Sequence, residues 1–128
     1  MAFPVPADRA FAYLADPRNR PQWQSSLRSV ADVRRDGAAW TDVTVVPGVR
    51  PRMRTTIDEP PYRWAEEGEL GPFRARLELR LTPGEAGTCT VRADFAVHGL
   101  GLGGLLTAGA RPAVAADLRR AARLVARR

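Results

Sequence analysis

Apolar and polar positions follow a helical period at both ends of the chain and a strand-like alternation between them. Apolar side chains recur three or four residues apart between Pro6 and Asp16, which predicts an amphipathic helix. Pro6 favours the start of this helix, and Pro17 ends it because a proline disfavours helical geometry in the preceding residue. A second, short helical turn is expected over Asn19–Gln24 and carries Trp23.

Six extended segments follow, and each is bounded by proline, glycine or aspartate in turn-forming combinations. Their short connections predict an antiparallel meander, because parallel strands need long crossovers. In two of the segments one face is apolar and the other is charged, which is typical of a sheet with one covered face. The expected strands are Leu27–Arg35, Trp40–Val46, Arg52–Glu59, Tyr62–Leu70, Phe73–Leu81 and Thr88–His98.

The C-terminal part of the chain predicts the element that covers the apolar face. Gly99–Gly104 forms a glycine-rich bend, and from about Leu105 an apolar stripe opposed by arginines predicts a helix to the end. Pro112 is expected to kink or interrupt this helix.

The N-terminus offers little sequence for a first strand. Either Ala2–Val5 is a shortened strand, or the chain starts upstream of Met1. A shortened strand leaves the backbone of its neighbours exposed, which predicts a homodimer formed through a sheet edge.

Composition excludes several classes of function. The 128 residues suit one domain, 1–128, with 45% hydrophobic and 27% charged residues. The net charge is +6, but the arginines are spread along the chain without the aromatic-interleaved stripe of single-strand binders, so no nucleic-acid partner is expected. Cys89 and His98 are the only residues of their types, which argues against a disulfide and against a metal site. Without a signal peptide or an apolar run of about 20 residues, no membrane insertion and a cytoplasmic location are expected.

Two longer stretches resemble a known superfamily. PVPADRAFAYLADPRNRPQW is similar to the opening of the SRPBCC (START-like) superfamily, and particularly of its polyketide cyclase/dehydratase branch. TIDEPPYRWAEEGELGPFRARLELRLTP resembles that family's strand–Pro-Pro–strand–Gly-Pro–strand section, and Gly87-Thr88 opens the last strand. The resemblance implies an α+β helix-grip fold. In this fold a curved antiparallel sheet of six to seven strands wraps around a long C-terminal helix, with two short helices after a truncated first strand.

A cupped sheet closed by a helix leaves interior space, and ligand pockets are typically apolar with a few polar groups. Because alternate residues of a strand share one face, Ala75, Ala93 and Ile57 are expected on the inner face of the sheet. The two faces of Trp40–Val46 are too alike to assign. Trp23 is expected to pack against the last helix and the sheet, with ligand contact as the alternative. The expected ligand-binding residues are Trp23, Met53, Thr55, Tyr62, Trp64, Glu66, Phe73, Leu77, Val91, Phe95, Leu106 and Ala110.

Glu66 is the candidate catalytic residue. Strand alternation places its carboxyl group on the inner face, among apolar side chains. Desolvation there would raise the pKa of the carboxyl group, which suits a general acid or base near neutral pH. The alternatives are that Glu66 is solvated near a strand end or pairs with an arginine.

Three other reactive side chains have plainer interpretations. His98 is expected to point outward at a strand end, with a place at the pocket mouth as the alternative. Asp117 either faces the cavity or forms a salt bridge with Arg111 or Arg120, and the salt bridge is favoured. Cys89 is expected in the core rather than as a nucleophile.

The sequence thus favours a protein that binds a small hydrophobic or aromatic molecule without cofactor or metal. The resemblance implies that any catalysis is proton transfer on the ligand, such as aldol cyclisation or dehydration, by a lyase or isomerase. The alternative is a protein-interaction module, co-chaperone-like or binding through its basic surface, in which side chains fill the cavity. A connected apolar space with Glu66 at its surface distinguishes the two.

Overall fold

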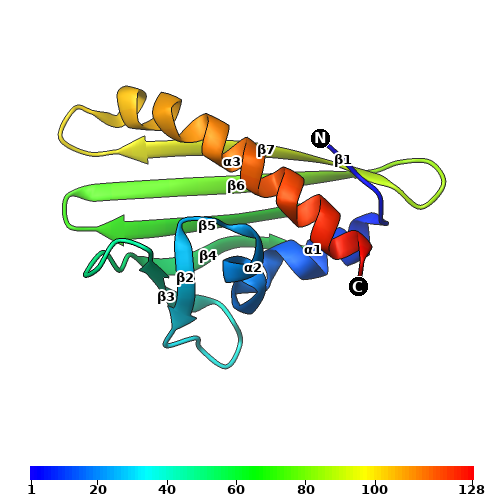
Figure 1. Ribbon diagram of the computed structural model, residues 1–128, viewed down its shortest axis with the longest axis horizontal. Helices are drawn as coiled ribbons and strands as arrows, with labels where there is room; N and C mark the ends of the chain where they lie inside the picture. The colour runs from blue at the N-terminus through cyan, green and yellow to red at the C-terminus, as the bar shows by residue number, and fades with distance from the viewer.

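Seven strands form one antiparallel sheet in the computed structural model, which describes residues 1–128 (Figure 1). The spatial order of the strands is β1-β7-β6-β5-β4-β3-β2, so consecutive strands from β2 to β7 are neighbours. The predicted meander and the predicted α+β helix-grip fold are therefore confirmed. The strands are β1 (Ala2–Phe3), β2 (Leu27–Ala31), β3 (Ala39–Thr44), β4 (Arg52–Glu59), β5 (Arg63–Leu70), β6 (Phe73–Pro83) and β7 (Cys89–His98).

The helices have nearly the bounds that the sequence predicts. Helix α1 (Ala7–Ala15) is followed by a 3-10 turn, η1 (Pro17–Asn19), and by α2 (Arg20–Trp23). The Asp16 side chain accepts a hydrogen bond of 3.0 Å from the backbone N–H of Arg18, which caps this turn. The last helix, α3 (Gly103–Ala126), continues through Pro112, so the expected interruption does not occur. No helix is both long and apolar enough to span a membrane.

Helix α3 lies diagonally across the inner face of the sheet, and its C-terminal end reaches α1 (Figure 1). All of its fully buried residues lie in the second half, where Leu118, Ala121 and Val125 join the main core. The Arg9 guanidinium donates to the carbonyl oxygens of Val125 and Arg128, at 3.3 and 2.8 Å, and ties this end to α1. The first half has no fully buried residue, and a cavity lies between it and the sheet.

The first strand has only two residues, as expected. It pairs with the start of β7 and not with β2, so the outer edge of β7 has no strand partner beyond this pairing. Self-association through this edge stays a prediction, which light scattering at high protein concentration tests.

A β-bulge changes the predicted inner face of β4. The register shifts between Thr55 and Ile57, and Ile57 lies opposite Ala65, which in turn faces Glu78 of β6 on the outer side. The predicted inner position of Ile57 is wrong, because one extra residue in a strand reverses the alternation beyond it.

Candidate functional site

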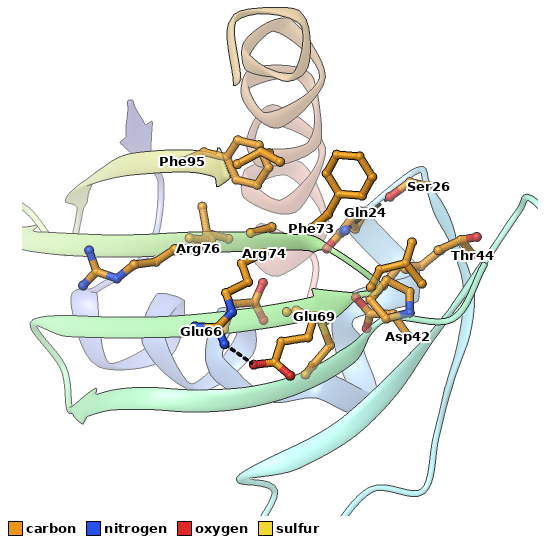
Figure 2. A pocket seen from close by; sticks show the side chains of 18 residues that line it. Gln24, Ser26, Asp42, Thr44, Glu66, Glu69, Phe73, Arg74, Arg76 and Phe95 are labelled. Carbon is orange, nitrogen blue, oxygen red and sulfur yellow. Dashed lines mark hydrogen bonds and ion pairs between the residues drawn. The ribbon is translucent and has the colours of Figure 1, made fainter. Parts of the chain in front are cut away.

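A cavity lies between the inner face of the sheet and α3. Its outer lobe measures about 260 Å³, and Met53, Gly68, Phe73 and Val97 contribute to its walls (Figure 2). Its inner lobe measures about 250 Å³ and lies below α3. The two lobes lie side by side because they share five lining residues. The shared residues are Gln24, Ser26, Glu66, Leu77 and Phe95.

The polar centre of the site is a buried ion pair between α2 and β5. Arg20 donates from Nη1 and Nη2 to the two carboxylate oxygens of Glu66, at 2.6 and 2.9 Å. The Arg20 side chain is 1% exposed and that of Glu66 6%. Such a two-pronged contact fixes the orientation of the carboxylate as well as its charge. Glu66 therefore follows the arginine-paired alternative.

Aromatic rings enclose Arg20. Its guanidinium carbon lies 4.9 Å from the ring centre of Trp23 and 5.1 Å from that of Trp64, distances at which a cation is attracted to the ring face. Its Nη1 also donates to Gln24 Oε1 at 3.0 Å, one helical turn along. Arg20 thus lies behind Glu66 and does not line either lobe.

Asp42 places a second carboxyl group beside Glu66 in the outer lobe (Figure 2). Its Oδ1 accepts a hydrogen bond of 2.9 Å from Trp40 Nε1, and the Trp40 ring stacks on Trp64 with centroids 6.5 Å apart. Burial raises the pKa of Asp42 from 3.8 to about 6, with a further rise from the negative charge of Glu66, against the opposing effects of Arg20 and the Trp40 hydrogen bond. Asp42 therefore titrates near neutral pH.

Asp117 contributes a third carboxyl group, which lines the inner lobe. The residue is 9% exposed, and its Oδ1 accepts a hydrogen bond of 3.2 Å from the backbone N–H of Ser25. The favoured salt bridge with Arg111 or Arg120 is wrong, because α3 turns Asp117 toward Ser25 while both arginines stay exposed.

Seven predicted lining residues do border the cavity, and five do not. Tyr62 is 58% exposed in the turn before β5, and Leu106 is 38% exposed on α3. Trp64 is buried against Arg20, Val91 lies near Met1 and Leu118, and Thr55 borders a surface hollow beside α1. Alternation identifies an inner face but not which part of it stays uncovered. The residues at the cavity are Trp23, Met53, Glu66, Phe73, Leu77, Phe95 and Ala110.

The remaining candidates lie where the sequence placed them. His98 is exposed at the end of β7 and borders neither lobe. Cys89 is buried in the core, where burial raises the pKa of its thiol.

The sequence interpretation missed Arg20, Asp42 and Gln24. The pattern Trp40-x-Asp42 puts both side chains on one strand face and was the available signal for Asp42. Arg20 had no comparable signal, because its helix has only four residues and its partner Glu66 lies 46 positions away.

A curved sheet, a covering terminal helix and a cavity between them define the class of helix-grip proteins. A family model described as "Polyketide cyclase / dehydrase and lipid transport" matches residues 1–128, and the chain belongs to this family. The family resemblance predicted from the sequence is thereby confirmed. No protein of curated function matches the chain by sequence.

Solved structures share the fold at low sequence identity. The Zhui aromatase/cyclase from Streptomyces sp. R1128 is 18% identical over 100% of this chain and 91% of its own, with a TM-score of 0.77. A START superfamily protein from Mycobacterium smegmatis is 13% identical over 99% and 92%, with a TM-score of 0.76. A conserved protein from Geobacillus kaustophilus is 15% identical over 99% and 92%, with a TM-score of 0.74. These likenesses show the fold.

Proposed function

We propose that this protein binds a small, mostly apolar molecule in the cavity between the sheet and α3. The observation that carries the proposal is unfilled space on both sides of Glu66, about 260 and 250 Å³, in a site with apolar walls. An interaction module with a collapsed cavity would have filled this space with side chains. The family and the aromatase/cyclase neighbours support an aromatic or polyketide-like ligand.

The walls suggest how such a ligand lies. Phe95 and Leu77 border both lobes, and Phe73 borders the outer lobe, so a flat apolar body has contacts along its length (Figure 2). Gln24 and Glu66 lie where the lobes meet and place polar atoms at one point between apolar walls. This combination of broad apolar contact and few polar contacts suits ligand orientation.

Binding of the neutral fluorescent probe N-phenyl-1-naphthylamine tests the proposal. The probe is expected to bind saturably, with enhanced fluorescence. Ala110→Phe fills part of the inner lobe and is expected to weaken binding about tenfold, which corresponds to about 1.4 kcal/mol. Ala108→Phe adds the same side chain at an exposed position of α3 and is the matched control. Absence of saturable binding, or equal effects of the two substitutions, would contradict a ligand in this cavity.

Proton-transfer catalysis is the second candidate, and the position of Asp42 favours it. A carboxyl group with a pKa of about 6 at the cavity surface can both take and return a proton near neutral pH. In a dehydration, Asp42 would remove a proton from the carbon beside the ligand carbonyl. Hydroxide would then leave from the next carbon, taking that proton to form water as the double bond forms. Glu66 is the other acid–base candidate, although Arg20 occupies both of its oxygens.

Dehydration of 4-hydroxy-4-phenylbutan-2-one, followed by absorbance of the conjugated product, tests this second candidate. Asp42→Asn is expected to remove turnover and to keep N-phenyl-1-naphthylamine binding. Unchanged turnover in Asp42→Asn would exclude Asp42 as the base. If turnover is lost in Glu66→Gln and kept in Asp42→Asn, the proton transfer is assigned to Glu66 instead.

A further inference from the structure

The cavity surface has an unbalanced charge. Three buried carboxyl groups line it, those of Asp42, Glu66 and Asp117, and only Arg20 lies among them. With all four groups ionised, three negative charges and one positive charge leave the interior at −2. The whole chain, in contrast, carries +6. The interior therefore has the opposite sign to the molecule as a whole.

The other arginines near the cavity do not remove this imbalance. Arg74 and Arg76 border the outer lobe, but they alternate with the inner residues of β6, and Arg74 reaches toward Glu69 (Figure 2). Their side chains are 73% and 44% exposed. Arg74 pairs with Glu69 at 3.7 Å and Arg76 with Glu78 at 4.0 Å. Charges in this position are screened by water and salt and act weakly on the interior.

In the inner lobe, Asp117 has a hydrogen-bond partner but no counter-charge, and the buried Trp23 Nε1 has no hydrogen-bond partner. Asp117 receives one hydrogen bond, from Ser25, and forms no ion pair, although the residue is nine-tenths buried. Gln24 is already engaged, since its Oε1 accepts from Arg20 and its Nε2 donates to Ser26 Oγ at 3.2 Å. A buried carboxylate without a counter-charge is costly, and a cation brought in with the ligand would offset that cost.

We propose that the ligand of this cavity is an amphipathic amine, with an apolar ring system along Phe95 and Leu77 and a protonated nitrogen at the carboxyl groups. The inference rests on the proposed ligand-binding function and adds the chemical class. The nitrogen lies near Glu66, between the Asp117 side and the Asp42 side, because Glu66 borders both lobes. Carboxylates and phosphates are disfavoured as ligands, because they would add negative charge to a site that already has an excess.

Binding of such an amine is coupled to proton release. Asp42 faces Glu66 of β5 and Arg20 of α2, and Trp40 of its own strand donates to it. A cation beside this group favours the ionised carboxylate and lowers its pKa from about 6. Affinity for an amine that stays protonated is therefore expected to rise between pH 5 and pH 7.

Four naphthalenes with the same ring system test the proposal by displacement of N-phenyl-1-naphthylamine at pH 7. They are 1-naphthylmethylamine, which is a cation, 1-naphthol, which is a neutral donor, 1-methylnaphthalene, which is apolar, and 1-naphthoate, which is an anion. The amine is expected to compete at a concentration about tenfold lower than methylnaphthalene, or about 1.4 kcal/mol, and naphthoate is expected to be the weakest. The advantage of the amine is expected to shrink at pH 5.

Asp117→Asn is expected to reduce the advantage of the amine and to leave methylnaphthalene unchanged. Asp94→Asn removes one negative charge from an exposed position outside the cavity and serves as the matched control. If naphthol displaces the probe as well as the amine does, or if naphthoate displaces it better than either, the inference is overturned while the proposed function stands. If neither the probe nor any naphthalene binds, the proposed function fails together with the inference.

Discussion

Glu66 and Glu78 lie on adjacent strands of one sheet, and the side chain of each is 6% exposed. Glu78 lies on the outer face of β6 and has three arginine partners, Arg63 at 2.5 Å, Arg80 at 3.6 Å and Arg76 at 4.0 Å. Glu66 lies on the inner face of β5 and has one partner, Arg20. Equal burial thus accompanies two very different arrangements of charge.

The difference lies in where the arginines are. The three partners of Glu78 have side chains 39%, 56% and 44% exposed, so water solvates all three. A hydrogen bond from Arg63 is the main cause of the lowered pKa of Glu78. Arg20 is 1% exposed and has no substitute. The outer cluster is a solvated surface network, whereas the inner pair is a fixed part of the cavity wall.

The largest expected effect comes from removing Arg20. Arg20→Met leaves Glu66 as an uncompensated charge in the interior and is expected to lower the free energy of unfolding by about 3–5 kcal/mol. Urea denaturation measures this loss. The matched change outside, Arg63→Met, removes an exposed partner and leaves two arginines at Glu78, so it is expected to cost much less. Equal losses would show that the two carboxyl groups are equivalent. The double variant Arg20→Met with Glu66→Leu is expected to recover most of the stability, because no isolated charge remains.

The second effect is a pH dependence due to Asp42. Its pKa is about 6 in the folded chain against an ordinary value of 3.8, so its contribution to stability is present below about pH 4 and is lost as the pH rises through about 6. The full loss is about 3 kcal/mol, since each tenfold change in proton affinity is worth about 1.4 kcal/mol. Asp42→Asn removes this dependence, so the variant is expected to gain stability over the wild type above pH 6 and not at pH 4. If urea denaturation shows the same difference in free energy of unfolding between Asp42→Asn and the wild type at pH 4 and above pH 6, the assignment to Asp42 is wrong.

The smallest effect concerns Glu78. Glu78→Gln is expected to cost about 0–1 kcal/mol at low salt and to cost less in 1 M NaCl, because exposed arginines are its partners. The pKa of Glu78 is lowered, so its contribution has the opposite sign to that of Asp42. It is present above the ordinary value and is lost as the pH falls through the folded value. A salt-insensitive loss would show that Glu78 behaves like the inner pair.

The sequence predicted the fold better than the site, for physical reasons. Strands with one wet face carry their pattern in consecutive residues, and α1 is bounded by Pro6 and Pro17, so these elements could be read locally. Whether a polar residue lines a cavity depends instead on residues far away in the sequence. The pairing of Arg20 with Glu66 and the contact of Asp117 with Ser25 are of this kind, with separations of 46 and 92 positions. The bulge after Thr55 has a local origin, but the adjacent residues Thr55 and Thr56 are of the same type and give no signal of an extra residue.

Helix α3 is anchored unevenly, and this has a consequence for how the molecule opens. Between Gly103 and Ala116 no residue is fully buried, and one side chain–backbone hydrogen bond, from Val97 to Thr107 at 2.9 Å, links this half to the sheet. Amide hydrogens in that half should exchange with deuterated solvent well before those around Leu118 and Val125. The half of the helix above the cavity is then expected to open first, which would give the proposed ligand a way in while the C-terminal turns stay closed.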